Sequence, residues 1–375
     1  MKTMAVICEY NPFHNGHKYQ LTQHKKELGA DSVICLMSGS FVQRGAPAVY
    51  DKWTRAEDAV KNGADLVLEL PVVYSAQSAQ RFAVGAVKLL DKLNVVDFLS
   101  FGSECGDINK LKECADIISS DNFIKLLEEK LKSGMSYPTA RTQVFYENFP
   151  KIDKTLIDSP NNILSIEYLN ALKNIKSKIE PKTILRNFDF ASATLIREKL
   201  ANNESVDDLT PTKTRKTYST KAFDNLVLYH FRKESPKALQ QICDVAEGIE
   251  NKFKKASQTA TTYDELANAV KSKRYTRTRI DRIIINSLLG IEHKHTELEP
   301  QYARVLAFNS KGQEILSVMK KASQIPVITK VADAKSENDD FNLMFEKDIL
   351  ATDIYSILTN NPAGLDFKTS PIIIK

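Results

Sequence analysis

The first hundred residues alternate short apolar runs with amphipathic stretches, and this alternation limits the fold more than any other feature. The apolar runs are rich in β-branched residues and bounded by polar residues or glycine, as buried strands are: 4–8, 32–37, 66–70 and 95–101. The stretches between them have helical spacing: 17–28, 53–62 and 79–93. Because strands that alternate with helices pair in parallel through crossover connections, the sequence predicts a doubly wound α/β sheet.

The rest of the chain is more helical. Four helices are expected before a break at 203–217 that contains Pro211: 108–118, 121–133, 161–174 and 192–201. Residues 221–290 have helical spacing throughout, whereas 301–375 mixes strand-like runs (303–308 and 325–328) with one helix (345–358). We therefore expect three domains, an α/β domain over 1–203, a helical region over 217–300 and a small α+β region over 301–375. Residues 371–375 fit either a last edge strand or a frayed tail.

The composition excludes several classes of protein. Lys and Arg number 52 and Asp and Glu 47, so a formal charge of +5 permits a polyanionic partner without demanding one. Five scattered cysteines without a CxxC pair fit neither a disulfide framework nor a zinc ribbon. The apolar stretch at 4–8 is too short for a signal peptide, and no segment approaches the roughly 20 apolar residues of a membrane helix. We expect a cytoplasmic protein without membrane contact; the sequence does not indicate its oligomeric state.

The most informative segment is EYNPFHNGH at 9–17, which leaves the first expected strand and enters the first expected helix. Ligands of open α/β sheets bind outside the carboxyl ends of the strands, and a helix N-terminus offers free N–H groups to an anion. Gly16 permits close approach of the backbone to a phosphate, and His14 and His17 are suited to donate hydrogen bonds to phosphate oxygens in a transition state. The alternative is that both histidines are capping or surface residues.

A second motif, SATLIR at 192–197, opens a later helix. Ser192 and Thr194 are expected to cap that helix and to offer hydroxyl groups, while Arg197 is suited to neutralise nucleotide phosphates. On its own this pattern also fits an ordinary capped helix. The two motifs in this order, HxGH and then SxTxxR, resemble the signatures of the nucleotidyltransferase superfamily.

Further segments narrow the resemblance. Besides the HxGH segment, they are SGSFVQRG at 38–45, FGSE at 101–104 and SPNNIL at 159–164. On these segments, the chain resembles the bacterial tRNA(Met) cytidine acetate ligase family over roughly residues 4–200. This resemblance implies an enzyme that uses ATP to activate acetate as acetyl-adenylate. It implies that the acetyl group then passes to the exocyclic amine of the wobble cytidine of elongator tRNA(Met).

The resemblance also assigns roles to residues. It implies His14, His17 and Arg197 as the catalytic set, and Ser192 and Thr194 beside the nucleotide. Further ATP contacts are implied along the first loop and at three later positions: Ile7, Cys8, Glu9, Tyr10, Asn11, Pro12, Phe13, His14, Asn15, Gly16, His17, Lys18, Tyr19, Gln20, Gly102, Asn162 and Arg186.

Three further expectations concern this site. Mg²⁺ is expected to accompany ATP, although the sequence has no metal-binding motif. Gln43 and Arg44 fit either an acetate or phosphate contact or a solvent-exposed turn. Cys8 is close to the loop, but a thioester role is not expected because a cysteine at the end of a buried strand usually packs as a small apolar residue.

A basic segment at 271–282 is the candidate RNA surface. It carries six cations and one acid: Lys271, Lys273, Arg274, Arg277, Arg279 and Arg282, with Asp281. Such a concentration of charge suits an RNA backbone, and Tyr275 is expected to stack on a base. The alternative is a solvated helix face.

Other functions remain open from the residues alone. An acetate ligase of the same fold that acetylates a carrier-protein thiol needs the same HxGH site but no RNA surface. A non-catalytic RNA-binding protein with a relic nucleotide pocket is a third reading, against which the intact His14, Gly16, His17 and Arg197 argue. An aminoacyl-tRNA synthetase fits less well because no KMSKS-like loop is present.

Overall fold

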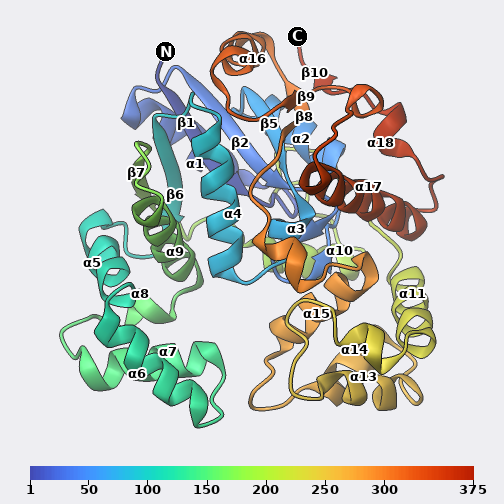
Figure 1. Cartoon of the computed structure of the whole chain (residues 1–375). Coiled ribbons are helices and arrows are strands. Elements are labelled where there is room, and N and C mark those ends of the chain that lie inside the picture. Colours follow the sequence, from blue (N-terminus) through green and yellow to red (C-terminus); the bar gives the residue numbers. More distant parts are fainter.

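A mixed sheet of eight strands lies at the centre of the computed structural model, which describes all residues from 1 to 375 (Figure 1). The strand order is β10-β8-β5-β2-β1-β6-β7, and β9 pairs with β8. All pairs are parallel except β5 with β8. The strands are β1 (Thr3–Cys8), β2 (Ser32–Ser38), β5 (Leu66–Leu70), β6 (Phe98–Ser103), β7 (Glu180–Leu185), β8 (Ala303–Phe308), β9 (Val327–Ile328) and β10 (Ile372–Ile373).

Helices cover both faces of the sheet, as a doubly wound fold requires. Alternate residues of each strand enter different cores: Ala5 packs with α4 (Ala79–Lys92) and α9 (Pro160–Asn174), whereas its neighbour Met4 packs with α1 (Asn15–Leu28) and α2 (Lys52–Lys61). The short helix α3 (Val72–Ser75) follows β5, and a small hairpin, β3 (Phe41–Val42) with β4 (Ala46–Pro47), follows β2.

Two groups of helices lie below the sheet in the view of Figure 1. The first group continues from β6 and packs around α9: α5 (Ile108–Ile118), α6 (Asp121–Lys132), α7 (Tyr137–Asn148) and α8 (Lys154–Asp158). The second group has its own core: α11 (Thr220–Lys233), α12 (Pro236–Leu239), α13 (Ile249–Ser257), α14 (Tyr263–Val270) and α15 (Arg277–Leu289). Between the two groups in the sequence lies α10 (Ala193–Ala201).

The C-terminal segment returns to the central sheet. It contains α16 (Ser310–Ala322), α17 (Asp339–Thr359) and α18 (Leu365–Lys368) besides β8, β9 and β10. The N-terminal half of α17 packs against the sheet core, and its C-terminal half packs into the core of α11–α15. A buried ion cluster adds a further link, since Lys52 and Arg304 both contact Glu69 and Asp366 at 2.7–3.1 Å.

The predicted fold class is confirmed, and so is the helical character of 221–290. Residues 301–375 do not build a sheet of their own, because β8 pairs with β5; the three-domain division stays a prediction. Of the two readings of the C-terminus, the edge strand is confirmed by the pairing of β10 with β8. Strand β7 was missed because it is an edge strand, half-exposed on both faces and without an apolar run.

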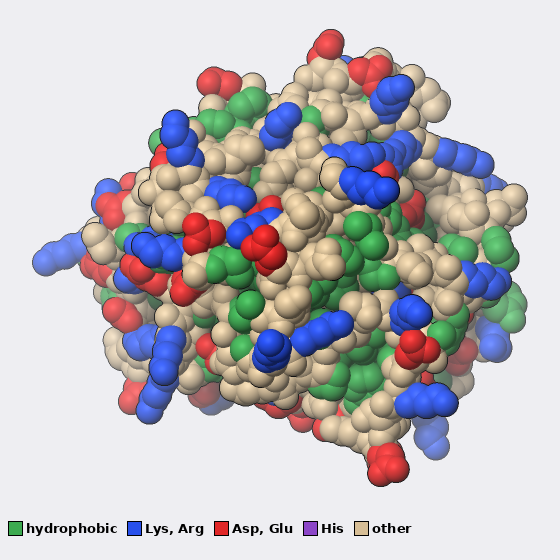
Figure 2. Space-filling view, turned by 90° about the horizontal axis from the view of Figure 1, so that it is seen from above, with side chains coloured by type: hydrophobic (Ala, Val, Ile, Leu, Met, Phe, Trp, Pro, Cys, Tyr) green, Lys and Arg blue, Asp and Glu red, His purple; other side chains and the backbone are tan.

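Figure 2 shows the molecule from above, where the amino ends of the parallel strands and both chain termini lie. Basic and acidic side chains are intermixed on this face, and no histidine is visible on it. None of the helices combines the length and the apolarity that a membrane-spanning segment needs.

Candidate active site

A cleft of about 440 Å³ opens at the carboxyl ends of β1, β6 and β7. The chain proceeds from β1 to β2 and β5 on one side of the sheet and continues to β6 and β7 on the other. The carboxyl ends of β1 and β6 therefore form a topological switch point, where open α/β sheets bind their ligands. Most of the predicted site residues line the cleft: Ile7, Cys8, Glu9, Tyr10, Asn11, His14, Gly16, His17, Tyr19, Gln20, Gly102, Arg186, Ser192, Thr194 and Arg197.

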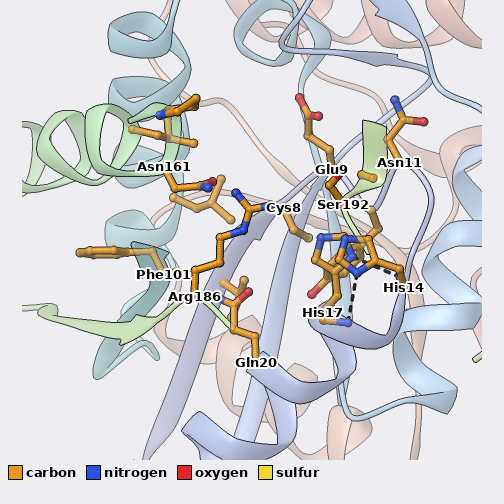
Figure 3. A pocket seen from close by; sticks show the side chains of 18 of the residues that line it. Cys8, Glu9, Asn11, His14, His17, Gln20, Phe101, Asn161, Arg186 and Ser192 are labelled. Carbon is orange, nitrogen blue, oxygen red and sulfur yellow. Dashed lines mark hydrogen bonds between the residues drawn. The ribbon is translucent and has the colours of Figure 1, made fainter. Parts of the chain in front are cut away.

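The two histidines of the first motif stack at the start of α1 (Figure 3). Their ring centroids are 3.7 Å apart, and the planes are inclined by 26°. His14 is the N-cap of α1, because its Nδ1 accepts a hydrogen bond from Gly16 N at 3.1 Å. His17 Nδ1 in turn accepts from His14 N at 3.3 Å. The capping role proposed as an alternative for His14 is therefore real, and it coexists with a place in the cleft wall.

These hydrogen bonds decide what the imidazoles offer to a ligand. When Nδ1 accepts, the proton of a neutral imidazole is on Nε2, which becomes the free donor. Burial, with Arg186 and Arg197 nearby, lowers the pKa of His14 to about 4, and burial beside His14 holds the pKa of His17 well below its ordinary value. Both rings are thus uncharged near neutral pH. They offer two N–H donors at a helix N-terminus, which is an arrangement suited to phosphate oxygens.

Gly16 is constrained by the histidines themselves. A Cβ at this position would lie 2.9 Å from His14 Cε1 and 3.3 Å from the Cβ of Phe190. Any larger residue would displace the His14 ring or the segment that carries Phe190. The close approach of a phosphate, which was the sequence-based reason for this glycine, stays a prediction.

Helix α10 brings the second motif to the first. Ser192 caps the helix, as expected, by accepting from Leu195 N at 3.2 Å. Arg197 donates from one nitrogen to the carbonyl oxygen of Asn11 at 2.8 Å and from another to Thr194 Oγ1 at 3.1 Å. These bonds place the guanidinium beside the loop between β1 and α1.

The β3–β4 hairpin forms another side of the cleft. Gln43 N donates to Glu9 Oε1 at 2.8 Å, and Gln43 Nε2 donates to the carbonyl oxygen of Gln77 at 3.0 Å. Arg44 lines the cleft, is exposed and has no ion-pair partner within 4.0 Å. Glu9 is the only acidic residue of the lining, and burial raises the pKa of its carboxyl group. A predicted contact of Gln43 and Arg44 with acetate or phosphate is compatible with this position.

The wall across from the histidines comes from β6, β7 and α9 (Figure 3). Arg186 follows the unpredicted strand β7 and lies 3.6 Å from Glu104. Glu104 accepts from the backbone nitrogens of Asn161 and Asn162 at the start of α9, at 3.3 and 2.8 Å. This carboxylate occupies the N-terminus of α9, so that anion site is already filled.

Five predicted contacts lie outside the cleft lining: Pro12, Phe13, Asn15, Lys18 and Asn162. Phe13 is buried and packs its ring against Tyr10, with 4.7 Å between centroids. Asn162 is buried as well, and its Oδ1 accepts from the backbone nitrogen of Glu104, while its neighbour Asn161 lines the cleft. The predicted contact of Asn162 with ATP stays a prediction, and its visible contact fixes the loop after β6.

Arg55 was missed by the sequence analysis. This residue of α2 is fully buried and donates hydrogen bonds to four carbonyl oxygens, those of Glu9, Ser38, Gly39 and Tyr50. It thereby joins the carboxyl ends of β1 and β2 to the loop that carries the first motif. No local pattern marks such a residue, since an arginine in an amphipathic helix is normally exposed.

Cys8 has the character of a packed residue. Its Sγ donates to the carbonyl oxygen of Leu36 at 3.7 Å, and burial raises the pKa of the thiol well above its ordinary value. Because the thiolate is the reactive form, a raised pKa makes this thiol less reactive, and the expectation that Cys8 forms no thioester stays a prediction.

Some of the cations in the basic segment at 271–282 already form ion pairs within the protein. Arg274 pairs with Glu247 at 2.5 Å, and Arg277 pairs with Asp264 and Asp281 at 2.5 and 2.7 Å. Lys271 and Lys273 are exposed without an ion-pair partner within 4.0 Å.

The other members of this segment support the fold. The expectation that Tyr275 stacks on a base is wrong, because its ring is buried under the Arg279 guanidinium, 4.3 Å away, and its hydroxyl donates to Ala246. Arg282 is mostly buried, and its backbone touches the β3–β4 hairpin at Gly45, which has a φ of +79°. The segment therefore lies one hairpin away from the cleft.

Comparisons with known proteins agree over the whole chain. A family model described as HIGH nucleotidyl transferase matches residues 1–369. A tRNA(Met) cytidine acetate ligase of Thermoanaerobacter sp. (strain X514) is 44% identical, with 98% of each chain covered, and one of Clostridium perfringens (strain ATCC 13124) is 39% identical, with 100% of each covered. Thermotoga maritima TmcAL bound with alpha-thio ATP superposes with a TM-score of 0.93 at 34% identity over 100% of both chains. The chain therefore belongs to the HIGH nucleotidyl transferase family and, within it, to the tRNA(Met) cytidine acetate ligases.

Proposed function

We propose that this protein is an ATP-dependent ligase that activates acetate as acetyl-adenylate and transfers the acetyl group to a tRNA. The acceptor is the exocyclic amine of the wobble cytidine of elongator tRNA(Met). The observation that carries this proposal is the agreement between full-length relatives of that name and a cleft that unites His14, His17 and Arg197. A related protein of the same fold, T. maritima TmcAL, is bound with alpha-thio ATP.

The first step needs charge stabilisation more than a protein nucleophile. An acetate oxygen attacks the α-phosphorus of ATP, the new P–O bond forms, and the bond to the β-phosphate oxygen breaks to release pyrophosphate. The Nε2–H groups of His14 and His17 are placed at the start of α1 to donate to the phosphate oxygens as charge develops. Arg197 supplies a fixed positive charge next to them.

The second step requires a proton acceptor. The cytidine amine attacks the acetyl carbon, a C–N bond forms, and the bond from that carbon to the phosphate oxygen breaks to release AMP. One proton leaves the amine, and Glu9, the only carboxylate in the lining, is the group we assign to receive it. Burial raises the pKa of this carboxyl group, which makes its carboxylate a stronger base than that of an exposed glutamate.

Mg²⁺ fits this scheme as a companion of the nucleotide. No group of three or more His, Cys, Asp and Glu side chains in the chain is arranged to hold a metal ion. Mg²⁺ commonly binds substrate phosphates with few protein ligands, so the phosphates of the nucleotide would hold the ion here. When bound, the ion would neutralise phosphate charge. We also propose a cytoplasmic location, where ATP and tRNA are both present.

The test is incubation of the purified protein with ATP, labelled acetate and total tRNA. Label is expected in tRNA as acetylcytidine, and it should require both ATP and acetate. In a parallel reaction that also contains an acyl carrier protein, label on the carrier thiol and none in tRNA would indicate the other acetate ligase. Binding of tRNA without pyrophosphate release would indicate the non-catalytic RNA-binding protein, and either result would overturn the proposal.

A further inference from the structure

The end of β7, the start of α10 and the segment between them expose three large apolar side chains at the edge of the cleft. Phe188 is 68% exposed, Leu185 58% and Leu195 43%. The same segment supplies residues that line the cleft, among them Arg186 and Phe190. Phe188 itself is not part of the lining, although these two residues, two positions before and after it, are.

This exposure does not come from a loosely held loop. On one side, Arg186 N donates to the carbonyl oxygen of Ser103 at 2.9 Å and so continues the pairing of β7 with β6. On the other side, Phe190 packs against Tyr19 of α1, with 5.5 Å between ring centroids. Between these anchors, Asp189 N donates to Asn187 Oδ1 at 2.8 Å. Phe188 is thus presented to solvent by a segment that is fixed at both ends.

The ring is paired with a cation. The guanidinium of Arg186 lies 5.5 Å from the centroid of Phe188. Aromatic rings and guanidinium planes are the two surfaces on which proteins stack the unstacked bases of single-stranded RNA. An exposed phenylalanine is costly to leave in water, and a stacked base would cover it.

We propose that Phe188 is a stacking platform for a base of the single-stranded RNA loop that carries the target cytidine. This proposal rests on the proposed function, because it names the surface by which the acceptor RNA is held at the cleft. Phe188 is a positioning residue: it holds the RNA so that the cytidine amine reaches the cleft, and it takes no part in acetate activation.

The experiment compares three variants of the full chain. Phe188→Ala removes the ring, Phe188→Trp keeps an aromatic face, and Phe367→Ala removes a phenylalanine of similar exposure (52%) on α18, outside the cleft. Two rates are measured for each, acetate-dependent ATP–pyrophosphate exchange and acetylation of an anticodon stem–loop RNA. Binding of the same RNA is measured by fluorescence anisotropy.

Phe188→Ala should lower kcat/KM for the RNA by about 5- to 150-fold, the range for loss of one stacked base, mainly through weaker RNA binding. Pyrophosphate exchange and the KM for ATP should stay at wild-type values, Phe188→Trp should restore acetylation, and Phe367→Ala should have no effect.

Wild-type acetylation by Phe188→Ala would overturn the platform and leave the proposed function intact. A raised KM for ATP in that variant would place Phe188 in the nucleotide site and also overturn it. If the wild-type protein acetylates no RNA, the proposed function fails and the platform with it.

Discussion

The imidazoles of His14 and His17 stack 3.7 Å apart, and each uses Nδ1 to accept a backbone N–H, which leaves Nε2–H as the free donor. Two motif residues three positions apart thus become one unit in which His14 organises the helix start and both rings face the cleft. The unit explains why the motif needs histidine at both positions and glycine between them. An aliphatic residue at either position would remove the acceptor that holds the turn as well as the donor.

Replacement of either histidine should abolish most of the acetate activation. We expect His14→Ala and His17→Ala each to slow acetate-dependent pyrophosphate exchange by about 10²- to 10³-fold, the usual effect of one donor to developing charge. His293→Ala is the control, because that histidine is exposed in a short helical turn outside the cleft. Exchange at the wild-type rate in both cleft variants would refute the assignment.

The pKa of His14, lowered from its ordinary 6.5 to about 4, predicts a specific dependence of stability on pH. Between pH 6.5 and 4 the unfolded state binds more protons at this site than the folded state does. The free energy of unfolding should therefore fall as the pH decreases through this window. Above pH 6.5, where His14 is neutral in both states, protonation of this residue should not lower it. In urea titrations at several pH values, His14→Asn should show a shallower decline than the wild type. Parallel declines would contradict the low pKa.

Gly16→Ala tests the packing of the stack. Its Cβ would lie 2.9 Å from His14 Cε1, so the ring must move and the Nε2–H donor with it. We expect weaker ATP binding by calorimetry and slower pyrophosphate exchange. Gly134→Ala, where φ is +89° and a Cβ meets nothing within 4 Å, strains the backbone outside the cleft and is the control for a loss of stability that does not involve the site. Equal ATP affinity in Gly16→Ala and the wild type would show that the stack does not form part of the site.

The parallel sheet and the place of the cleft could be predicted because both depend on local signals. Apolar runs alternate with amphipathic stretches, and the motif lies where a strand gives way to a helix. The place of Asn161 in the cleft lining could not be predicted, and the expected ATP contact of Asn162 stays a prediction. Both begin α9, and the rotation of that helix against β6 decides which side chain meets the cleft and which holds the Glu104 loop.

The ion pairs of the basic segment could not be predicted, because their acidic partners are distant in the sequence. Arg274 and Arg277 read as free cations because Glu247 and Asp264 belong to other helices and loops, and only the fold brings them together. Arg55 is the converse case. Its four carbonyl partners lie at 9, 38, 39 and 50, so nothing in its own helix indicates that it is buried.

Arg55→Met should destabilise the protein and disturb the nucleotide loop together. The variant removes the guanidinium donor from four carbonyl oxygens, and one hydrogen bond to a charged group contributes about 1.5–3 kcal/mol. We expect the free energy of unfolding, measured by urea titration, to fall by at least about 3 kcal/mol and the KM for ATP to rise. Arg44→Met, at an exposed arginine without an ion pair, should leave the unfolding free energy unchanged. A stable Arg55→Met variant would mean that water replaces the guanidinium.

The proposed contact of the basic segment with RNA is best tested at Lys271 and Lys273, which are exposed and form no ion pair. Reversing Arg274 or Arg277 would break ion pairs with Glu247 or Asp264, so a loss of activity there would not separate RNA binding from folding. Lys271→Glu with Lys273→Glu changes the charge as much as reversing both arginines would, but at exposed, unpaired positions. If both lysines meet phosphates, tRNA affinity should fall, and the slope of log affinity against log salt should become shallower by about 0.9 for each lost contact. Acetate-dependent pyrophosphate exchange should stay at the wild-type rate.

The matched control is Lys320→Glu with Lys321→Glu on α16, which lies at the top of Figure 1, away from the cleft. Equal salt slopes for both double variants and the wild type would leave 271–282 a solvated surface.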